Sequence, residues 1–297
     1  ATDTSLPSLL AANLVPDFVI SVDCQNHSYH HFLAGVPSST KVVLDLASPN
    51  LLYRVHDRVI PVAGGHPFAK LLVSNYYPFP EIDTSGGNVT HAAVSFSLLI
   101  GAREVIVHGA DFSYPQGKLY ARGTYCYPLF LASQTRTDPL QARFAQMLMG
   151  QGSLGVSTDG DGNIRYKTGL LSSYRAHFES FTAGLPIRVV LADNKRETVA
   201  DRIPRAGVPV APTVFPPLNT DWQGLCEHLL SRLSTMEFPM LPANTILHAL
   251  SVSDRNILTA AMPLAAYHYR RAPGIPASSL LRMAAEDAEN ILRHSLA

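Results

Sequence analysis

The sequence predicts an α/β protein with a mostly parallel, doubly wound sheet covered by helices. Short runs rich in Val, Ile and Leu recur along the first two thirds of the chain, and helix-like segments separate them. Most of these runs are apolar at successive positions, which indicates strands buried on both faces, as in parallel sheets. Alternation of such strands with helices is typical of layered α/β folds.

Turn-forming residues bound each of the expected strands. We expect strands at residues 17–22, 41–46, 59–62, 104–108 and 187–192. The clearest helix is expected at residues 88–100, where apolar residues recur at helical spacing until Gly101 stops the pattern. Further helices are expected at residues 4–13, 139–150 and 170–183.

A proline-rich stretch divides the chain. Five prolines fall within residues 203–218, and proline disrupts both helix interiors and central strands. We therefore expect an α/β nucleotide-binding domain at 1–202, a linker at 203–220 and a helical C-terminal domain at 221–297. In the last domain we expect helices at residues 221–233, 245–265 and 278–296.

Composition narrows the range of partners and compartments. Lys and Arg total 23, the same as Asp and Glu, so no net charge favours a nucleic acid or an anionic membrane. The three cysteines are far apart, which argues against a disulfide framework or a zinc ribbon and fits a reducing cytosol. No apolar run is long enough to span a bilayer, so we expect a cytoplasmic protein without a membrane span.

A glycine-rich turn precedes the helix expected at residues 88–100. Its residues are Thr84, Ser85, Gly86, Gly87 and Asn88. Unpaired backbone N–H groups and the helix dipole favour an anion such as a phosphate at such a position. The alternative is an ordinary helix cap, for which Ser and Thr are preferred in any case.

A second polar segment follows the strand expected at residues 104–108. Asp111, Phe112 and Tyr114 lie at its carboxyl end, where open α/β sheets bind ligands. Asp111 could bind a ribose hydroxyl, hold Mg²⁺ or act as a base; the alternative is a carboxylate that caps the next turn. Asp23 ends the first strand in the same way, with the same alternative.

The loop after Asp111 combines cations with aromatic rings. Lys118 and Arg122 could neutralise a diphosphate, and Tyr120 could stack on a base; a solvated loop is the alternative. A histidine cluster at residues 27–31 has no HExxH pattern around it, so we expect a surface helix there and assign no metal ligands.

Several segments resemble one family. They are PDFVISVD at 16–23, SGGNV at 85–89 followed by LIG at 99–101, and VIVHGADFSY at 105–114. With them the chain resembles the MptE-like family, which includes the motility-associated factor (Maf) flagellin glycosyltransferases and the archaeal 6-hydroxymethylpterin diphosphokinases. The resemblance covers residues 1–194, and LAAYHYR at 264–270 is typical of a spirochaete-type member.

The resemblance implies a Rossmann-like, sialyltransferase-like fold. It implies that Thr84, Ser85 and Gly86 contact the nucleotide or donor sugar, and that Asp111 lines the same pocket with its two aromatic neighbours. Family members carry a Gly-rich loop on an earlier strand, and none precedes residue 17 here. We therefore expect the N-terminal part of the domain to be missing from this chain.

The expected function is transfer of a nonulosonic (sialic-acid-like) sugar from a CMP donor to Ser or Thr of flagellin, with Asp111 as the base. We assign no cofactor to this reaction from the sequence. One alternative is ATP-dependent diphosphorylation of 6-hydroxymethylpterin, for which Mg²⁺ would be needed. Another is a catalytically inactive domain that binds flagellin or another partner. The oligomeric state stays open, with a homo-oligomer among the expected assemblies.

Overall fold

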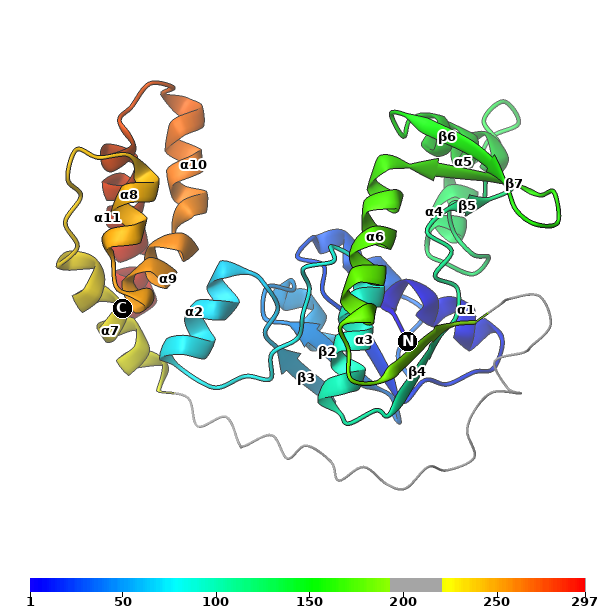
Figure 1. The fold of residues 1–297 in the computed structure, drawn as a ribbon, viewed down its shortest axis with the longest axis horizontal. Helices are drawn as coiled ribbons and strands as arrows, with labels where there is room; N and C mark the ends of the chain where they lie inside the picture. The colour runs from blue at the N-terminus through cyan, green and yellow to red at the C-terminus, as the bar shows by residue number, and fades with distance from the viewer. Residues whose placement is uncertain (193–220, 297) are drawn as a thin grey trace. The chain divides into compact units, whose positions relative to one another are not determined.

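The computed structural model describes residues 1–192 and 221–296, and packing divides them into two compact units. The first, here called the α/β unit, comprises Ala1–Val62 and the described residues from Ile82 onward to 192. The second, the helical unit, comprises Ala63–Glu81 and residues 221–296 (Figure 1). The linker expected at residues 203–220 lies outside the described residues. Strands and helices mix in the first unit, which confirms the α/β class.

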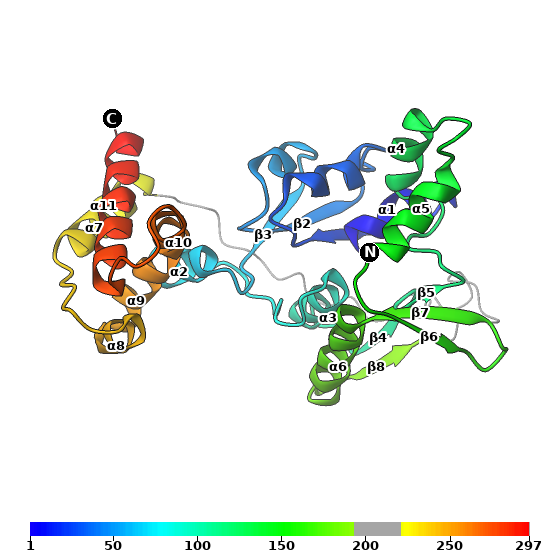
Figure 2. The ribbon, with the colours of Figure 1, turned by 90° about the horizontal axis from the view of Figure 1, so that it is seen from above.

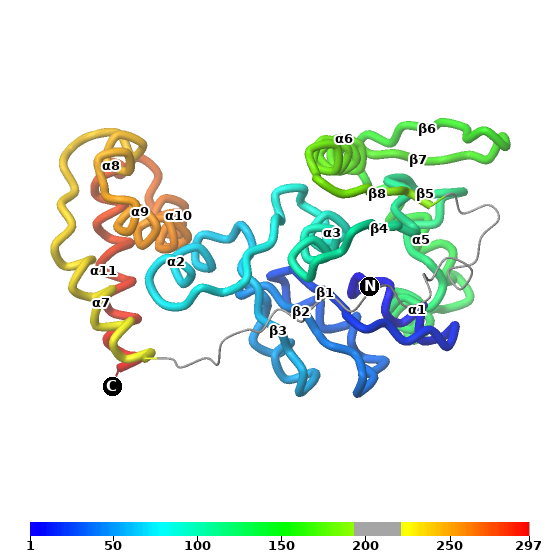
Figure 3. Tube along the Cα trace, turned by 60° about the horizontal axis from the view of Figure 1, so that its bottom comes forward, coloured from blue at the N-terminus to red at the C-terminus, as the bar shows by residue number. Residues whose placement is uncertain are grey.

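A three-stranded parallel sheet lies at the centre of the α/β unit. Strands β1 (Phe18–Ser21), β2 (Lys41–Asp45) and β3 (Val59–Val62) pair in that order, with Ile20 opposite Val43 and Leu44 opposite Pro61 (Figure 3). The consecutive apolar residues of β2 are explained by its burial, because Val42, Val43 and Leu44 have no exposed surface on either face of the sheet. The expected parallel pairing is thereby confirmed.

Both faces of this sheet are covered. On one face, short helices pack over Val19, Val42 and Leu44; they are α1 (Leu6–Ala11), η2 (Asn26–Phe32) and η3 (Asn50–Arg54). On the other face, α3 (Val89–Leu99) packs its Ala92 and Phe96 on Ile20 and Val43. Successive residues of β2 therefore serve opposite cores, as the two-residue period of a strand requires.

Two further expected strands form a separate pair. Strand β4 (Glu104–Val107) pairs in parallel with β8 (Arg188–Leu191), and their hydrogen bonding does not extend to the β1–β3 sheet among the described residues. Helix α6 (Gly169–Ala183) precedes β8. A single continuous doubly wound sheet of Rossmann type therefore stays a prediction.

A small antiparallel sheet was absent from the expected elements. Strands β5 (Tyr114–Pro115), β6 (Leu154–Thr158) and β7 (Ile164–Thr168) pair in the order β5-β7-β6 (Figure 2). The sequence pattern missed them because the hairpin buries little: Val156 is 65% exposed and Ile164 is 47% exposed. Helices α4 (Cys126–Ser133) and α5 (Leu140–Met149) precede β6 in the chain.

The helical unit contains the C-terminal helices and one segment from much earlier in the chain. Its helices are α2 (Pro67–Asn75), α7 (Trp222–Ser234), α8 (Ala243–Ala249), α9 (Val252–Ala260), α10 (Met262–Arg271) and α11 (Ala277–Leu296). Helix α2 packs on α9, where the Ser253 hydroxyl donates to Asn75 Oδ1 at 2.7 Å. Residues 63–81 therefore pack with the C-terminal helices. The expected domain boundary at residue 202 had assigned these residues to the α/β domain.

The prediction of a single helix at residues 245–265 is wrong, because parts of three helices, α8, α9 and α10, occupy that stretch. Ser251 begins α9, where its hydroxyl accepts the N–H of Asp254 at 3.1 Å. Pro263 lies in the first turn of α10, where proline is tolerated because its missing N–H is not needed. Among the helices that the structure describes, none combines the length and apolarity needed to cross a membrane.

Candidate functional site

A hollow of about 810 Å³ in the α/β unit brings Asn88, the last residue of the first predicted segment, together with the segment around Asp111. Its walls come from the start of α3, the loop after β4, the loop at residues 118–122, and side chains of α5 and α6. The predicted residues that line it are Asn88, Asp111, Phe112, Tyr114 and Tyr120. The candidate site is therefore an open cavity with contributions from both ends of the α3–β4 segment.

Not every predicted residue lies at this hollow. Thr84, Ser85, Gly86 and Gly87 form the turn just before it and are not part of its lining. Gly87, whose φ is +68°, lies next to Tyr174, a residue that lines the hollow. A Cβ atom at position 87 would lie 3.0 Å from Cε1 of that tyrosine.

Hydrogen bonds within the turn use up some of the backbone donors expected to hold an anion. The N–H of Ser85 donates to Asp83 Oδ1 at 2.7 Å, and that of Gly87 donates to the Thr84 carbonyl at 3.1 Å. Asn88 caps α3 by accepting the N–H of His91 at 3.0 Å. By helix geometry, the N–H groups left for a ligand in this first turn are those of Val89 and Thr90.

A buried histidine lies beneath the turn. His91 is 1% exposed, its Nε2 lies 3.3 Å from Asp83 Oδ2, and its ring stacks on Phe181 with centroids 3.9 Å apart. Burial raises the pKa of Asp83, but hydrogen bonds from Ser85 and the proximity of His91 outweigh it, so the net pKa lies below its usual value. The contact of His91 with Asp83 therefore stabilises the turn, whose Gly86 packs directly on the imidazole ring.

Arg165 holds Asp111, and the sequence did not point to it. The guanidinium of Arg165 lies 3.4 Å from Asp111 Oδ1, 3.2 Å from the Ser113 hydroxyl and 3.2 Å from Asp159 Oδ2. Arg165 belongs to β7, so only prediction of the antiparallel hairpin could have placed it here. The guanidinium offsets the charge of Asp111 and fixes where the carboxylate points.

Aromatic rings and two cations complete the hollow. Burial and the proximity of Tyr174 raise the pKa of Tyr114, and burial and Cys126 raise that of Tyr120, so both stay neutral phenols. Lys118 and Arg122 line the hollow with exposed side chains, and neither pairs with a carboxylate of the described residues. Flat rings beside exposed cations suit a ligand that has both a ring and a phosphate.

Asp23 lies elsewhere. It is exposed in the loop after β1, is not part of the lining, and accepts the N–H of Gln25 at 3.0 Å, which is the turn-forming alternative.

The neighbouring histidines pack around one phenol. The ring centroids of His27, His30 and His31 lie 4.9, 5.5 and 4.9 Å from that of Tyr125. Among the described residues, no three His, Cys, Asp or Glu side chains are arranged to hold a metal ion.

The first part of the chain matches a known protein family. Residues 1–117 match the family described as 6-hydroxymethylpterin diphosphokinase MptE-like, which confirms the resemblance for that segment. The matched segment includes the turn and Asp111 but ends before Arg165 and Tyr174.

Two uncharacterized proteins of the spirochaete Treponema pallidum (strain Nichols) are similar to the chain. One is 30% identical over 182 residues, which is 60% of this chain and 64% of the relative. The other is 26% identical over 128 residues, 39% of this chain and 33% of the relative. The matches thus span less than two thirds of either relative.

One solved structure has a distant overall likeness. The MAf glycosyltransferase from Magnetospirillum magneticum AMB-1 superposes with a TM-score of 0.45 at 13% identity. The superposition covers 99% of this chain and 45% of that chain.

Proposed function

We propose, starting from the match of residues 1–117 to the MptE-like family, that the chain binds a nucleotide-linked donor and acts in group transfer. The best-supported form is a Maf-type glycosyltransferase that moves a nonulosonic acid from CMP to Ser or Thr of flagellin in the cytoplasm. One observation carries this proposal: Asn88 and Asp111 line one hollow whose aromatic walls are accompanied by the exposed cations Lys118 and Arg122.

Each part of the hollow has a role in this proposal. The cytosine ring stacks on Tyr120, while Lys118 and Arg122 offset the phosphate charge. The N–H groups of Val89 and Thr90 add donors at the positive end of α3. The turn at residues 84–87 supports this helix start, and Phe112 and Tyr114 form the floor beside it.

Asp111 is the proposed catalytic residue. The acceptor hydroxyl oxygen bonds to the anomeric carbon as the bond from that carbon to the CMP phosphate oxygen breaks. CMP leaves with the bonding electrons, and the hydroxyl proton passes to Asp111, which Arg165 keeps in place. Catalysis in this scheme depends mainly on positioning and on the cations that stabilise the leaving phosphate.

A second candidate is the diphosphokinase reaction named in the family description, in which a pterin alcohol receives a diphosphate group. ATP would be the donor of that group. That chemistry needs Mg²⁺ held by oxygen ligands. Asp111 is the one predicted carboxylate at the hollow, because Asp23 lies outside its lining. The two acids therefore do not form a shared ligand pair at this cavity.

Calorimetric titration separates these candidates. The chain is titrated with CMP, with CTP and with ATP plus Mg²⁺, alongside Tyr120→Ala and, as a matched control, Tyr267→Ala on α10 of the helical unit. The glycosyltransferase proposal requires cytidine nucleotide binding that Tyr120→Ala weakens and Tyr267→Ala does not. Binding of ATP·Mg²⁺ without a response to cytidine nucleotides supports the diphosphokinase. No response to any nucleotide supports the inactive partner-binding domain.

A further inference from the structure

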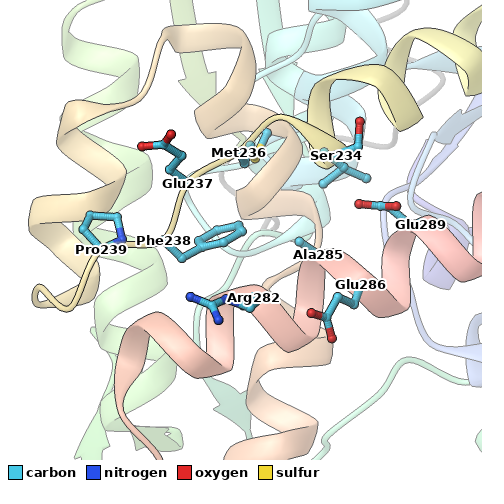
Figure 4. Close-up of a pocket in the computed structure, with 10 residues that line it drawn as sticks. Ser234, Met236, Glu237, Phe238, Pro239, Arg282, Ala285, Glu286 and Glu289 are labelled. Carbon is cyan, nitrogen blue, oxygen red and sulfur yellow. The ribbon is translucent and has the colours of Figure 1, made fainter.

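The helical unit has a groove of its own, of about 500 Å³ (Figure 4). It lies between the end of α7, the segment that follows it at residues 236–239, and α11. All of its lining belongs to the helical unit, so it is a different cavity from the hollow near Asp111.

The floor of the groove is apolar. Leu233 and Ala285 are 3% exposed each, and Met236 and Phe238 are half-buried beside them. Figure 4 shows the ring of Phe238 directed toward α11. A side chain that covered this floor would remove further apolar surface from water, which is favourable.

Exposed apolar residues extend this surface along the chain. Met240 is 77% exposed and Leu241 is 46% exposed, and both follow Pro239 of the groove in the segment between α7 and α8. Large exposed apolar side chains beside a groove add apolar surface that a bound partner could cover.

The border of the groove is acidic. It carries the carboxylates of Glu237, Glu286 and Glu289 against one guanidinium, that of Arg282. Arg282, Glu286 and Glu289 project from α11, and Glu237 comes from the segment on the other side (Figure 4). Three negative charges against one positive charge disfavour an anionic ligand here and favour a cationic one.

Two of these carboxylates are available to a partner. Glu289 lies 3.4 Å from Arg293 one turn later on α11, an exposed pair of small energetic value. Glu237 and Glu286 form no ion pair with a cation of the described residues. Charge complementarity therefore favours a partner that carries positive charge.

We propose that this groove docks a basic peptide segment in which Lys or Arg residues flank a large apolar side chain. The apolar side chain covers Met236 and Phe238, and the cations reach Glu237 and Glu286. This goes beyond the proposed transferase function, because it assigns a peptide site to a unit that the nucleotide does not use.

The test titrates the full chain, labelled with ¹³C at its methionine methyl groups, with the amidated tetrapeptide Lys-Phe-Lys-Leu. Binding is expected to shift the methyl signals of Met236 and Met240 and to weaken as salt is raised, because exposed charges are screened. Two comparison peptides separate the contributions: Glu-Phe-Glu-Leu reverses the charge, and Lys-Ser-Lys-Ser removes the apolar side chains. Neither is expected to shift these signals.

Matched variants tie the binding to the groove. The double variant Glu237→Gln, Glu286→Gln is expected to weaken binding of Lys-Phe-Lys-Leu roughly tenfold, the effect of losing two exposed ion pairs. Glu227→Gln, which removes one exposed charge from α7 outside the groove, is the control. Equal shifts from all three peptides, no shift at about millimolar peptide, or unchanged affinity in the double variant would each overturn the proposal. CMP titration of the same variants keeps this result separate from the proposed function.

Discussion

A Cβ atom on Gly86 would overlap Nδ1 of His91, so the turn before α3 fits over the imidazole only because residue 86 has no side chain. His91 is buried and its ring is held between the turn and Phe181, which leaves little room to move. The glycine here serves close packing, since its φ is not in the left-handed region.

Gly86→Ala is therefore expected to destabilise the α/β unit by about 1–3 kcal/mol, the usual cost of overpacking. Denaturant unfolding followed by circular dichroism measures the loss. Gly160→Ala is the control, because nothing lies within 4 Å of a Cβ atom at that position. In the double variant with His91→Ala, the loss should be smaller than the sum of the two single losses. Strict additivity would show that the imidazole is not what excludes the side chain.

The cations of the hollow should control nucleotide affinity. Lys118→Gln with Arg122→Gln is expected to weaken CMP binding roughly tenfold, because two exposed positive charges near the phosphate are lost. Salt should weaken CMP binding to the native chain more than to this variant. The control is Arg175→Gln on α6, whose guanidinium already pairs with Glu179 at 2.7 Å. If the control lowers affinity as much, the effect is one of overall charge.

An ion pair in the helical unit should make its stability depend on acid pH. Hydrogen bonds from Arg232, at 2.8 and 2.5 Å, and from Ser251 hold the pKa of Asp254 below its usual value despite partial burial. A carboxylate with a lowered folded pKa stabilises above its unfolded pKa, and this contribution is lost as pH falls through the folded value.

Asp254→Asn should therefore reduce the free energy of unfolding by about 1–2 kcal/mol at neutral pH and by less as pH falls below about 4. Urea unfolding at a series of pH values measures the difference between variant and native chain. Asp57→Asn, at an exposed position of the α/β unit, is the control. If the difference in free energy of unfolding between Asp254→Asn and the native chain stays constant across the pH series, the stabilisation does not come from the charge of Asp254.

Tyr53 should produce an alkaline transition. Burial, together with the nearby charge of Asp45, raises the pKa of Tyr53 to about 12, and its hydroxyl donates to the Asp45 carbonyl at 3.0 Å. Since the folded pKa lies above the unfolded value, this contribution to stability is present below about pH 10 and is lost as pH rises toward 12.

The measurement compares unfolding free energies of the native chain and Tyr53→Phe between neutral and alkaline pH. The part of the decline due to Tyr53 should be missing from the variant. Tyr267→Phe is the matched control, because Tyr267 is 52% exposed. The expectation fails if Tyr53→Phe and the native chain lose stability in parallel.

The strands of the parallel sheet were predictable because their pattern is local. A run such as residues 42–44 is apolar at consecutive positions, and only burial on both faces explains that. Asn88 and Asp111 were also predictable as neighbours of one cavity, since both lie close to the ends of an α3–β4 segment. Arg165 was not, because it enters through an antiparallel hairpin with exposed apolar residues and no clear alternation.

The sequence by itself determined the class of the fold, the parallel pairing of its first strands and the placement of Asn88 and Asp111 at one cavity. These follow from short-range periodicity and from which residues end a strand or begin a helix. Only the tertiary structure decided that Arg165 holds Asp111, that His91 supports the turn, and that α2 packs on α9. Such contacts join residues far apart in sequence, and they depend on shape and burial that no local pattern records.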